Sequence, residues 1–247
     1  MDDQPGPARV AVVSTLVRAL STVARLRRRL APAPPPRELL VQRYASGKSF
    51  ADIGCMWGID GAIAFTAEDA GAVDVVGLDL MPASDAFERE RARRGSRMRF
   101  IQGDLHDPAV MARVGPHDVV WCSGVIYHAP HPLLTIERLR SVTTETLILS
   151  SETMPEIPGL RQACVFLPAL TDADRLAHAS ARPGRTALGL SEPFDRGHSY
   201  GAWWWGLSRS ALRGMLAASG FTVTDESGDA LHATFVARAP IDADRAS

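Results

Sequence analysis

Short apolar stretches alternate with charged, helix-like ones along residues 37–151, and this alternation leaves few possible folds. Strands separated by helices form βαβ units, whose parallel sheet is covered on both faces. Towards the C-terminus this pattern changes. A helix over 208–219 is followed by two strands, 221–226 and 232–238, with a turn at Gly228 and Asp229 between them. We predict a doubly wound, mostly parallel α/β sheet of seven strands with a C-terminal antiparallel hairpin. The other predicted strands are 49–53, 74–80, 98–103, 118–123 and 146–151, and the other helices are 37–45, 60–70 with Asp60 as N-cap, 84–94, 108–114 and 131–142.

Glycine and acidic residues follow three of these strands, at the edge where ligands of such sheets bind. Gly54 allows a tight turn and a close backbone approach to a ligand. Asp79 lies 25 residues later, where a carboxylate grips a ribose hydroxyl pair, and Asp104 is placed to accept from an adenine amine. The dinucleotide pattern needs two further glycines, but those positions hold Met56 and Ile59. The sequence therefore favours a nucleoside cofactor without phosphates.

In this order and spacing the residues resemble the class I S-adenosylmethionine-dependent methyltransferases, clearly over 45–151 and loosely over 208–239. The resemblance implies S-adenosylmethionine as cofactor and a Rossmann-like sheet. The family's middle glycine is Met56 here, so we expect Met56 and Trp57 to line the methionine pocket. The cofactor-binding residues that the resemblance implies are Asp52, Gly54, Met56, Trp57, Gly58, Asp79, Leu80, Asp104, Leu105, Cys122 and Ser123.

Three of these side chains also have a purely structural interpretation. Asp52 could cap a turn, and Asp104 begins a stretch with the composition of a turn held by Asx hydrogen bonds. Cys122 has the size and polarity of a core residue. Both interpretations stay open at the level of sequence.

An oxygen acceptor of high pKa needs a general base near the end of the fourth strand, whereas methyl transfer itself mainly needs in-line positioning. His128 is the first candidate, because imidazole titrates near neutral pH. Further acid–base candidates are Tyr127 beside it, His198, Tyr200 and Glu152. Alternatively, Tyr127 and His128 shape the cofactor pocket. The histidines here lack a clear third ligand, so no metal site is predicted.

Outside the sheet the chain has a leader, an insertion and a tail. Residues 8–30 place apolar residues at helical spacing and end in arginines, so this helix could bind a membrane surface or a partner, or pack on the domain or in a homodimer. The insertion is long enough to form a lid, and of its tryptophans at 203–205 at least one should be core. The predicted organisation is a helix and Pro-rich linker over 1–36, a domain over 37–240 with an acceptor-binding lid over 152–207, and a disordered tail over 241–247.

Residues 121–128 are also similar to enzymes that modify the wobble uridine of tRNA. Ala129 stands where those enzymes tend to carry arginine to meet the extra carboxylate of their cofactor, so we expect plain S-adenosylmethionine here. The formal net charge of −1 gives no sign of a phosphate-binding surface. We therefore predict a small-molecule acceptor, a hydroxyl of a sugar or natural-product scaffold, and no nucleic-acid partner. A tRNA-modifying enzyme and a catalytically silent nucleoside-binding module are the alternatives.

Cysteine spacing and hydropathy bear on the compartment. Cys55, Cys122 and Cys164 fit neither a disulfide framework nor a metal site, which suits a reducing cytoplasm. No apolar run reaches the ~18 residues of a membrane span. The sequence therefore predicts a cytoplasmic enzyme.

Overall fold

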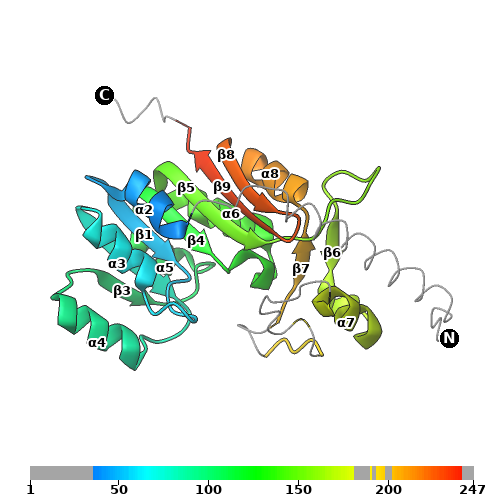
Figure 1. The fold of residues 1–247 in the computed structure, drawn as a ribbon, viewed down its shortest axis with the longest axis horizontal. Helices are drawn as coiled ribbons and strands as arrows, with labels where there is room; N and C mark the ends of the chain where they lie inside the picture. Colours follow the sequence, from blue (N-terminus) through cyan, green and yellow to red (C-terminus); the bar gives the residue numbers. More distant parts are fainter. Residues whose placement is uncertain (1–35, 181–189, 191–192, 198–201, 241–247) are drawn as a thin grey trace.

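A seven-stranded sheet forms the centre of the computed structural model, which describes residues 36–180, 190, 193–197 and 202–240 (Figure 1). Its strands are β1 (Ser49–Ile53), β2 (Asp74–Asp79), β3 (Arg99–Gln102), β4 (His117–Ser123), β5 (Thr143–Glu152), β8 (Thr222–Asp229) and β9 (His232–Arg238). The strand order is β3-β2-β1-β4-β5-β9-β8. All neighbours are parallel except β9, which runs antiparallel to both β5 and β8. The predicted fold class is confirmed.

Helices cover both faces of the sheet because side chains of successive strand residues alternate between them. On one face Phe50 and Trp121 pack against α2 (Arg37–Ala45), α3 (Ala62–Asp69) and α4 (Asp85–Arg94). On the other face Ile53 and Leu149 pack against α5 (Pro108–Val114), α6 (Pro132–Val142) and α8 (Arg209–Ala218). The sheet therefore has a buried apolar layer on each side, as the alternation predicts.

Two predicted local details are wrong. Asp60 does not cap α3, because Gly61, in the left-handed region at φ 76°, occupies the N-cap position. The Asp60 carboxylate instead accepts a hydrogen bond from the Ser84 hydroxyl at 2.6 Å. Gly228 and Asp229 are not the hairpin turn but the end of β8. The Asp229 carboxylate accepts from the Leu231 amide at 2.8 Å, which places the turn directly after the strand.

The insertion between β5 and α8 contains a small sheet of its own. It is built from β6 (Cys164–Phe166), a 3-10 turn (Leu167–Ala169), α7 (Asp172–Ser180) and β7 (Trp205–Leu207). β6 and β7 pair in an antiparallel register, and Figure 1 shows them with α7 at one end of the main sheet, away from α3 and α4. The Met154 amide donates to the Leu207 carbonyl at 2.9 Å, which ties the insertion to the end of β5.

Several predictions fall outside the described residues. The helix over 8–30, the linker that follows it and the tail over 241–247 belong to that group. Within the described part of the chain, no helix combines the length and the apolar character that crossing a membrane requires.

Candidate functional site

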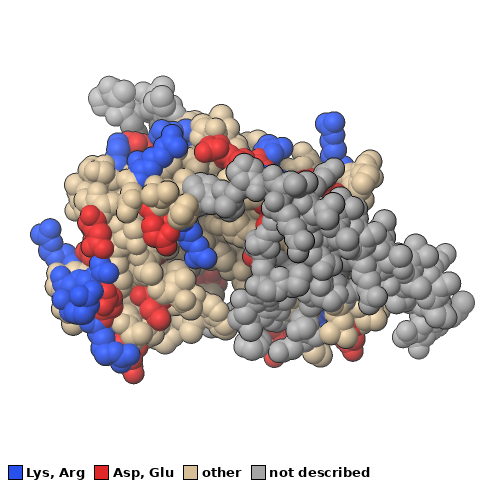
Figure 2. Space-filling view, viewed as in Figure 1, with Lys and Arg blue, Asp and Glu red and all other residues tan. Residues whose placement is uncertain are grey.

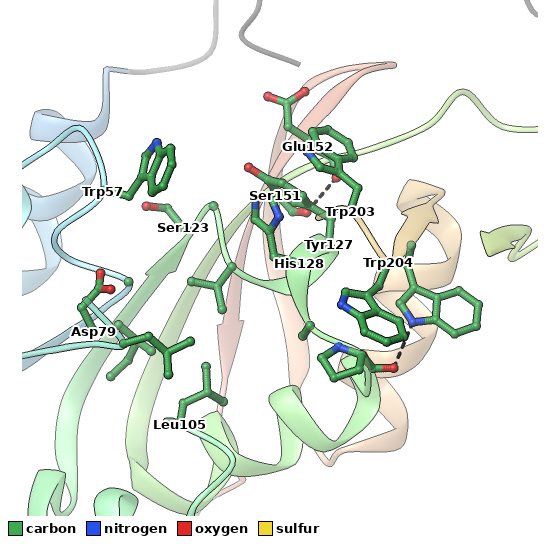
Figure 3. A pocket seen from close by; sticks show the side chains of 18 of the residues that line it. Trp57, Asp79, Leu105, Ser123, Tyr127, His128, Ser151, Glu152, Trp203 and Trp204 are labelled. Atoms are coloured by element: carbon green, nitrogen blue, oxygen red, sulfur yellow. Dashed lines mark hydrogen bonds between the residues drawn. The ribbon is translucent and has the colours of Figure 1, made fainter. Parts of the chain in front are cut away.

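A cavity of about 1090 Å³ opens at the carboxyl ends of the parallel strands, where the strand order reverses between β1 and β4. Ligands of doubly wound sheets bind at this position. The cavity continues from the strand ends to the insertion, so one space joins the predicted cofactor site and the predicted lid. Figure 3 shows Trp57 and Asp79 at one end, Trp203 and Trp204 at the other, and Ser123, Tyr127 and His128 between them.

Asp79 lines the cavity from the end of β2 and is held in one orientation by backbone amides. The Met56 amide donates to Oδ2 at 2.7 Å and the Met81 amide to Oδ1 at 2.8 Å. Burial raises the pKa of Asp79, and these amides, with those of Leu80 and Trp57, partly oppose that rise. A fixed carboxylate at this strand end is suited to accept hydrogen bonds from a pair of ligand hydroxyls.

The loop after β1 approaches β4 closely because Gly54 has no side chain. Gly54 has φ +85°, and a Cβ there would lie 2.4 Å from Cγ2 of Val125. Gly54 and Trp57 line the cavity, and Trp57 is 47% exposed. Met56 and Gly58 do not line it: the Met56 side chain is buried in the core on the α3 side, and only its amide reaches the site. Of the two side chains predicted to line a methionine pocket, only that of Trp57 faces the cavity.

Asp52 lies beneath this loop and outside the cavity lining, contrary to its assignment as a cofactor contact. It is fully buried on the face of the sheet covered by α3, and neither carboxylate oxygen has a hydrogen-bond partner in the described structure. Burial raises the pKa of Asp52 to about 7. The nearby Ala64 amide, which lies outside hydrogen-bond geometry, partly opposes the rise, and the charge of Asp79 adds to it. The side chain is therefore a buried carboxyl group beside the site and not part of its lining.

Asp104 forms a turn and also lines the cavity. Its Oδ1 accepts from the His106 amide at 2.8 Å, which is the expected Asx turn, and lies 3.1 Å from His106 Nδ1. The side chain is also half exposed and lines the cavity beside Leu105. His106 Nε2 in turn lies 2.8 Å from the Thr135 hydroxyl, so α6 fixes the orientation of the turn. Leu80 completes the predicted residues at this end.

At the end of β4, one residue belongs to the core and the next lines the cavity. Cys122 is fully buried between the sheet and its helices, does not line the cavity, and has a pKa raised by burial. Ser123, the next residue, faces the cavity. Cys122 is thus the core residue that its size suggests, and its assignment as a cofactor contact is not supported.

His128 lines the middle of the cavity and makes one protein hydrogen bond that fixes its tautomer. Its Nδ1 lies 3.0 Å from the Ala202 carbonyl oxygen. Because a carbonyl only accepts, we assign the proton to Nδ1 and the lone pair to Nε2. Burial lowers the pKa of His128, and the bond to Ala202 partly opposes this. The imidazole is therefore neutral at pH 7 and equipped to accept a proton.

The turn after β4 and the strand before α8 are held together by three contacts. Besides the bond from His128 to Ala202, the Trp204 amide donates to the Tyr127 carbonyl at 2.9 Å. The Trp205 indole donates to the Pro130 carbonyl at 3.1 Å. We call these three bonds the turn–strand seam. It fixes the insertion to the segment that carries the candidate base.

Aromatic side chains dominate the insertion end of the cavity. Trp203 is 4% exposed and packs on the Tyr127 ring with centroids 4.3 Å apart, which confirms that one tryptophan of the three is core. Trp204 and Trp205 remain partly exposed, and all three line the cavity. His198 lies outside the described residues, so its assignment stays a prediction.

Sequence reasoning missed several lining residues. The most informative are Val125, Ser150, Ser151 and Phe166, and Arg37 and Arg196 also line the cavity. The sequence could have indicated Ser150 and Ser151 as lining residues, because they lie near the end of the strand beside β4 and precede Glu152, which also lines the cavity. No sequence feature indicates Phe166, because its position depends on strand pairing within the insertion. Among the described residues, no cluster of histidine, cysteine and acidic side chains has a metal-binding arrangement.

Residues 45–181 match the model of a family described as a methyltransferase domain. A curated relative, the ubiquinone biosynthesis O-methyltransferase of Vibrio campbellii, is 35% identical over 91 residues, which cover 36% of this chain and 37% of the relative. The matched region is thus well under half of that relative's length.

Solved structures share the fold at low sequence identity. The N-terminal domain of EvdMO1 with SAH bound has a TM-score of 0.57 and 15% identity, covering 84% of this chain and 82% of that one. The 1,6-didemethyltoxoflavin-N1-methyltransferase of Burkholderia thailandensis has a TM-score of 0.55 and 14% identity, covering 97% and 92%. The family model covers more than half of the chain. The chain therefore belongs to the class I S-adenosylmethionine-dependent methyltransferases, as its motifs predicted.

Proposed function

We propose that the protein transfers the methyl group of S-adenosylmethionine to a hydroxyl of a small molecule, a sugar or natural-product scaffold. The observation that carries this proposal is a single cavity with the fixed Asp79 carboxylate at one end and neutral His128 in its middle. The curated relative is named an O-methyltransferase, which agrees with an oxygen acceptor.

The residues at the strand ends suit the cofactor. Asp79 would hold the ribose hydroxyls, and Asp104 with Leu80 and Leu105 would surround the adenine. Gly54 and Trp57 would contact the methionine portion, with Ser123 at the entrance to the transfer centre. This assignment follows from which side chains line the cavity, and it leaves out Asp52, Met56, Gly58 and Cys122.

His128 would act as general base on the acceptor. S-adenosylmethionine, when bound, supplies an electrophilic methyl group on a sulfonium leaving group. Nε2 of His128 accepts the acceptor's hydroxyl proton as the new carbon–oxygen bond forms and the carbon–sulfur bond breaks. The Ala202 carbonyl stabilises the resulting imidazolium through Nδ1–H. Tyr127, whose ring lies 4.3 Å from that of His128, restricts the imidazole to one orientation.

A tRNA acceptor finds little support on the visible surface. Figure 2 shows basic and acidic side chains intermixed over α4. Glu90 pairs with Arg93 and Arg94 at 2.6 Å, and Arg94 also pairs with Asp69 at 2.7 Å. Arginines neutralised in this way do not form the unpaired basic face that phosphate binding needs.

Two further proposals concern the setting of the enzyme. Cys55 and Cys122 are buried free thiols, which supports the proposal that the protein works in a reducing cytoplasm. The proposal that a homodimer forms through the N-terminal helix is carried by the leader sequence alone and is tested by the oligomeric state with and without residues 1–36.

Methyl-labelled S-adenosylmethionine, added to an extract of the native host with the purified protein, tests the function directly. We expect label in a small molecule, and no labelling above background with the Asp79→Ala variant. Label in RNA would overturn the proposed acceptor class. No label in any fraction, although the protein binds the cofactor, would indicate the catalytically silent alternative.

A further inference from the structure

We infer that the acceptor carries a planar aromatic ring, which binds on an aromatic wall formed by Phe166, Trp204 and Trp205. This inference rests on the proposed methyl transfer and selects among its possible acceptors. It would favour a phenol-type natural-product scaffold over a polyhydroxylated sugar.

The aromatic wall is a product of the small sheet in the insertion. Phe166 and Trp205 are cross-strand partners on β6 and β7, with ring centroids 5.1 Å apart. The Trp204 ring lies 6.4 Å from Phe166 and is supported by Phe194 in an edge-to-face contact at 4.8 Å. Phe166 is 43% exposed although it is a large apolar side chain within a cavity. Exposed aromatic surface in a concave site is typical of a ligand contact.

The wall is held against the candidate base. The turn–strand seam joins the wall residues Trp204 and Trp205 to Tyr127 and Pro130, which flank His128 in sequence. Figure 3 shows His128 between Asp79 and Trp204. A ring stacked on the wall would therefore lie on the acceptor side and present its substituent toward the base.

The polarity of the cavity distinguishes an aromatic ring from a sugar. A buried sugar needs polar partners for each hydroxyl, because an unsatisfied hydroxyl costs binding free energy. The described lining residues include serines, histidines and arginines but no asparagine or glutamine. Two of the serines are already engaged within the protein: Ser150 Oγ lies 3.0 Å from His232 Nε2, and the Ser151 hydroxyl donates to the Glu152 carbonyl at 2.7 Å. Next to the wall, Leu167, Leu190 and Trp203 form an apolar cluster. Such surroundings suit a flat ring with few hydroxyls.

Naphthol and its saturated counterpart decahydronaphthol test the inference, because both have the same carbon skeleton and one hydroxyl. Their binding is measured by calorimetry on the full chain, with S-adenosylhomocysteine titrated separately. We expect naphthol to bind about tenfold more tightly than decahydronaphthol, since stacking adds to apolar burial. Trp204→Leu and Phe166→Leu should each reduce that preference severalfold, and Trp204→Phe should largely retain it. Tyr44→Leu, on α2 and outside the cavity lining, is the matched control and should leave the preference unchanged.

Equal binding of the two compounds, binding of neither, or a preference that survives both leucine variants overturns the aromatic acceptor. Loss of the naphthol preference in Tyr44→Leu would also overturn the inference, because the preference would then not depend on the aromatic wall. Failure of the proposed methyl transfer is a separate result, seen as absent S-adenosylhomocysteine binding while the naphthol preference is still measurable.

Discussion

Replacing Asp52 with asparagine is expected to stabilise the protein, and to do so more strongly in alkaline than in acidic solution. The wild-type carboxyl is fully buried beneath the Gly54 loop, and neither oxygen has a hydrogen-bond partner among the described residues. Burial raises its pKa from the ordinary value of 3.8 to about 7. Asparagine occupies nearly the same volume and carries no charge at any pH.

The direction in which stability changes with pH follows from proton binding. Between pH 4 and pH 7 the folded state holds a proton on Asp52 that the unfolded chain releases, so wild-type stability falls as pH rises through this window. At ~1.4 kcal/mol per pKa unit, the full effect above pH 7 is about 4 kcal/mol, and about 2–3 kcal/mol of it develops between pH 5 and pH 8. The amide's own packing cost is independent of pH and cancels in that comparison.

Urea unfolding of wild type and Asp52→Asn at pH 5 and pH 8 measures the difference directly. The variant should gain roughly 2–3 kcal/mol relative to wild type between the two pH values. Asp85→Asn, exposed in the first turn of α4, is the matched control and should show little change. An equal stability difference at both pH values for Asp52→Asn would refute the buried, unpartnered carboxylate. The variant should also keep its affinity for S-adenosylmethionine within a few fold, because Asp52 does not line the cavity.

Three further substitutions address the site. Asp79→Ala should weaken S-adenosylmethionine binding more than tenfold in calorimetry, since charge-assisted bonds to the ribose are lost; unchanged affinity would reject the ribose assignment. His128→Ala should lower turnover and leave cofactor affinity nearly intact. Because burial lowers the pKa of His128, the wild type should lose activity only as the pH falls below the ordinary histidine pKa of 6.5, and the variant should not show this loss. Equal losses of turnover and affinity would place His128 in the cofactor pocket instead. Gly54→Ala should cost about 1–3 kcal/mol in thermal unfolding and weaken cofactor binding, because its Cβ would meet Val125 and its φ is +85°.

Much of the fold is predictable from local signals. The βαβ alternation, the cap at Ser84 and Pro108 at the start of α5 depend on residues near one another, and the observed elements begin and end within a few positions of the predicted ones. The exception at Asp60 is instructive. Its residue type suits an N-cap, but Gly61 packs against Phe87 so closely that a Cβ would lie 2.6 Å from that ring. A contact with α4, absent from the local sequence, sets the start of α3.

The cofactor end of the site is predictable in residue type but less so in orientation. A motif identifies the segment that forms the loop, while the alternation along a strand decides which side chain faces the cavity. Ser123 faces it and Cys122 does not, although the two are neighbours. Asp79 lies at a strand end with its carboxylate toward the cavity, whereas Asp52 precedes the end of β1 and faces α3.

The acceptor end depends on contacts between segments that are far apart in the sequence. Sequence alone identifies His128 as a candidate base, yet its usefulness as a base depends on the Ala202 carbonyl, which leaves Nε2 unprotonated. That carbonyl is in place because Trp204 and Trp205 bind the turn after β4. The same residues form the aromatic wall. One set of long-range hydrogen bonds thus sets both the tautomer of the candidate base and the surface beside it, so a change in the insertion should alter acceptor choice and turnover together.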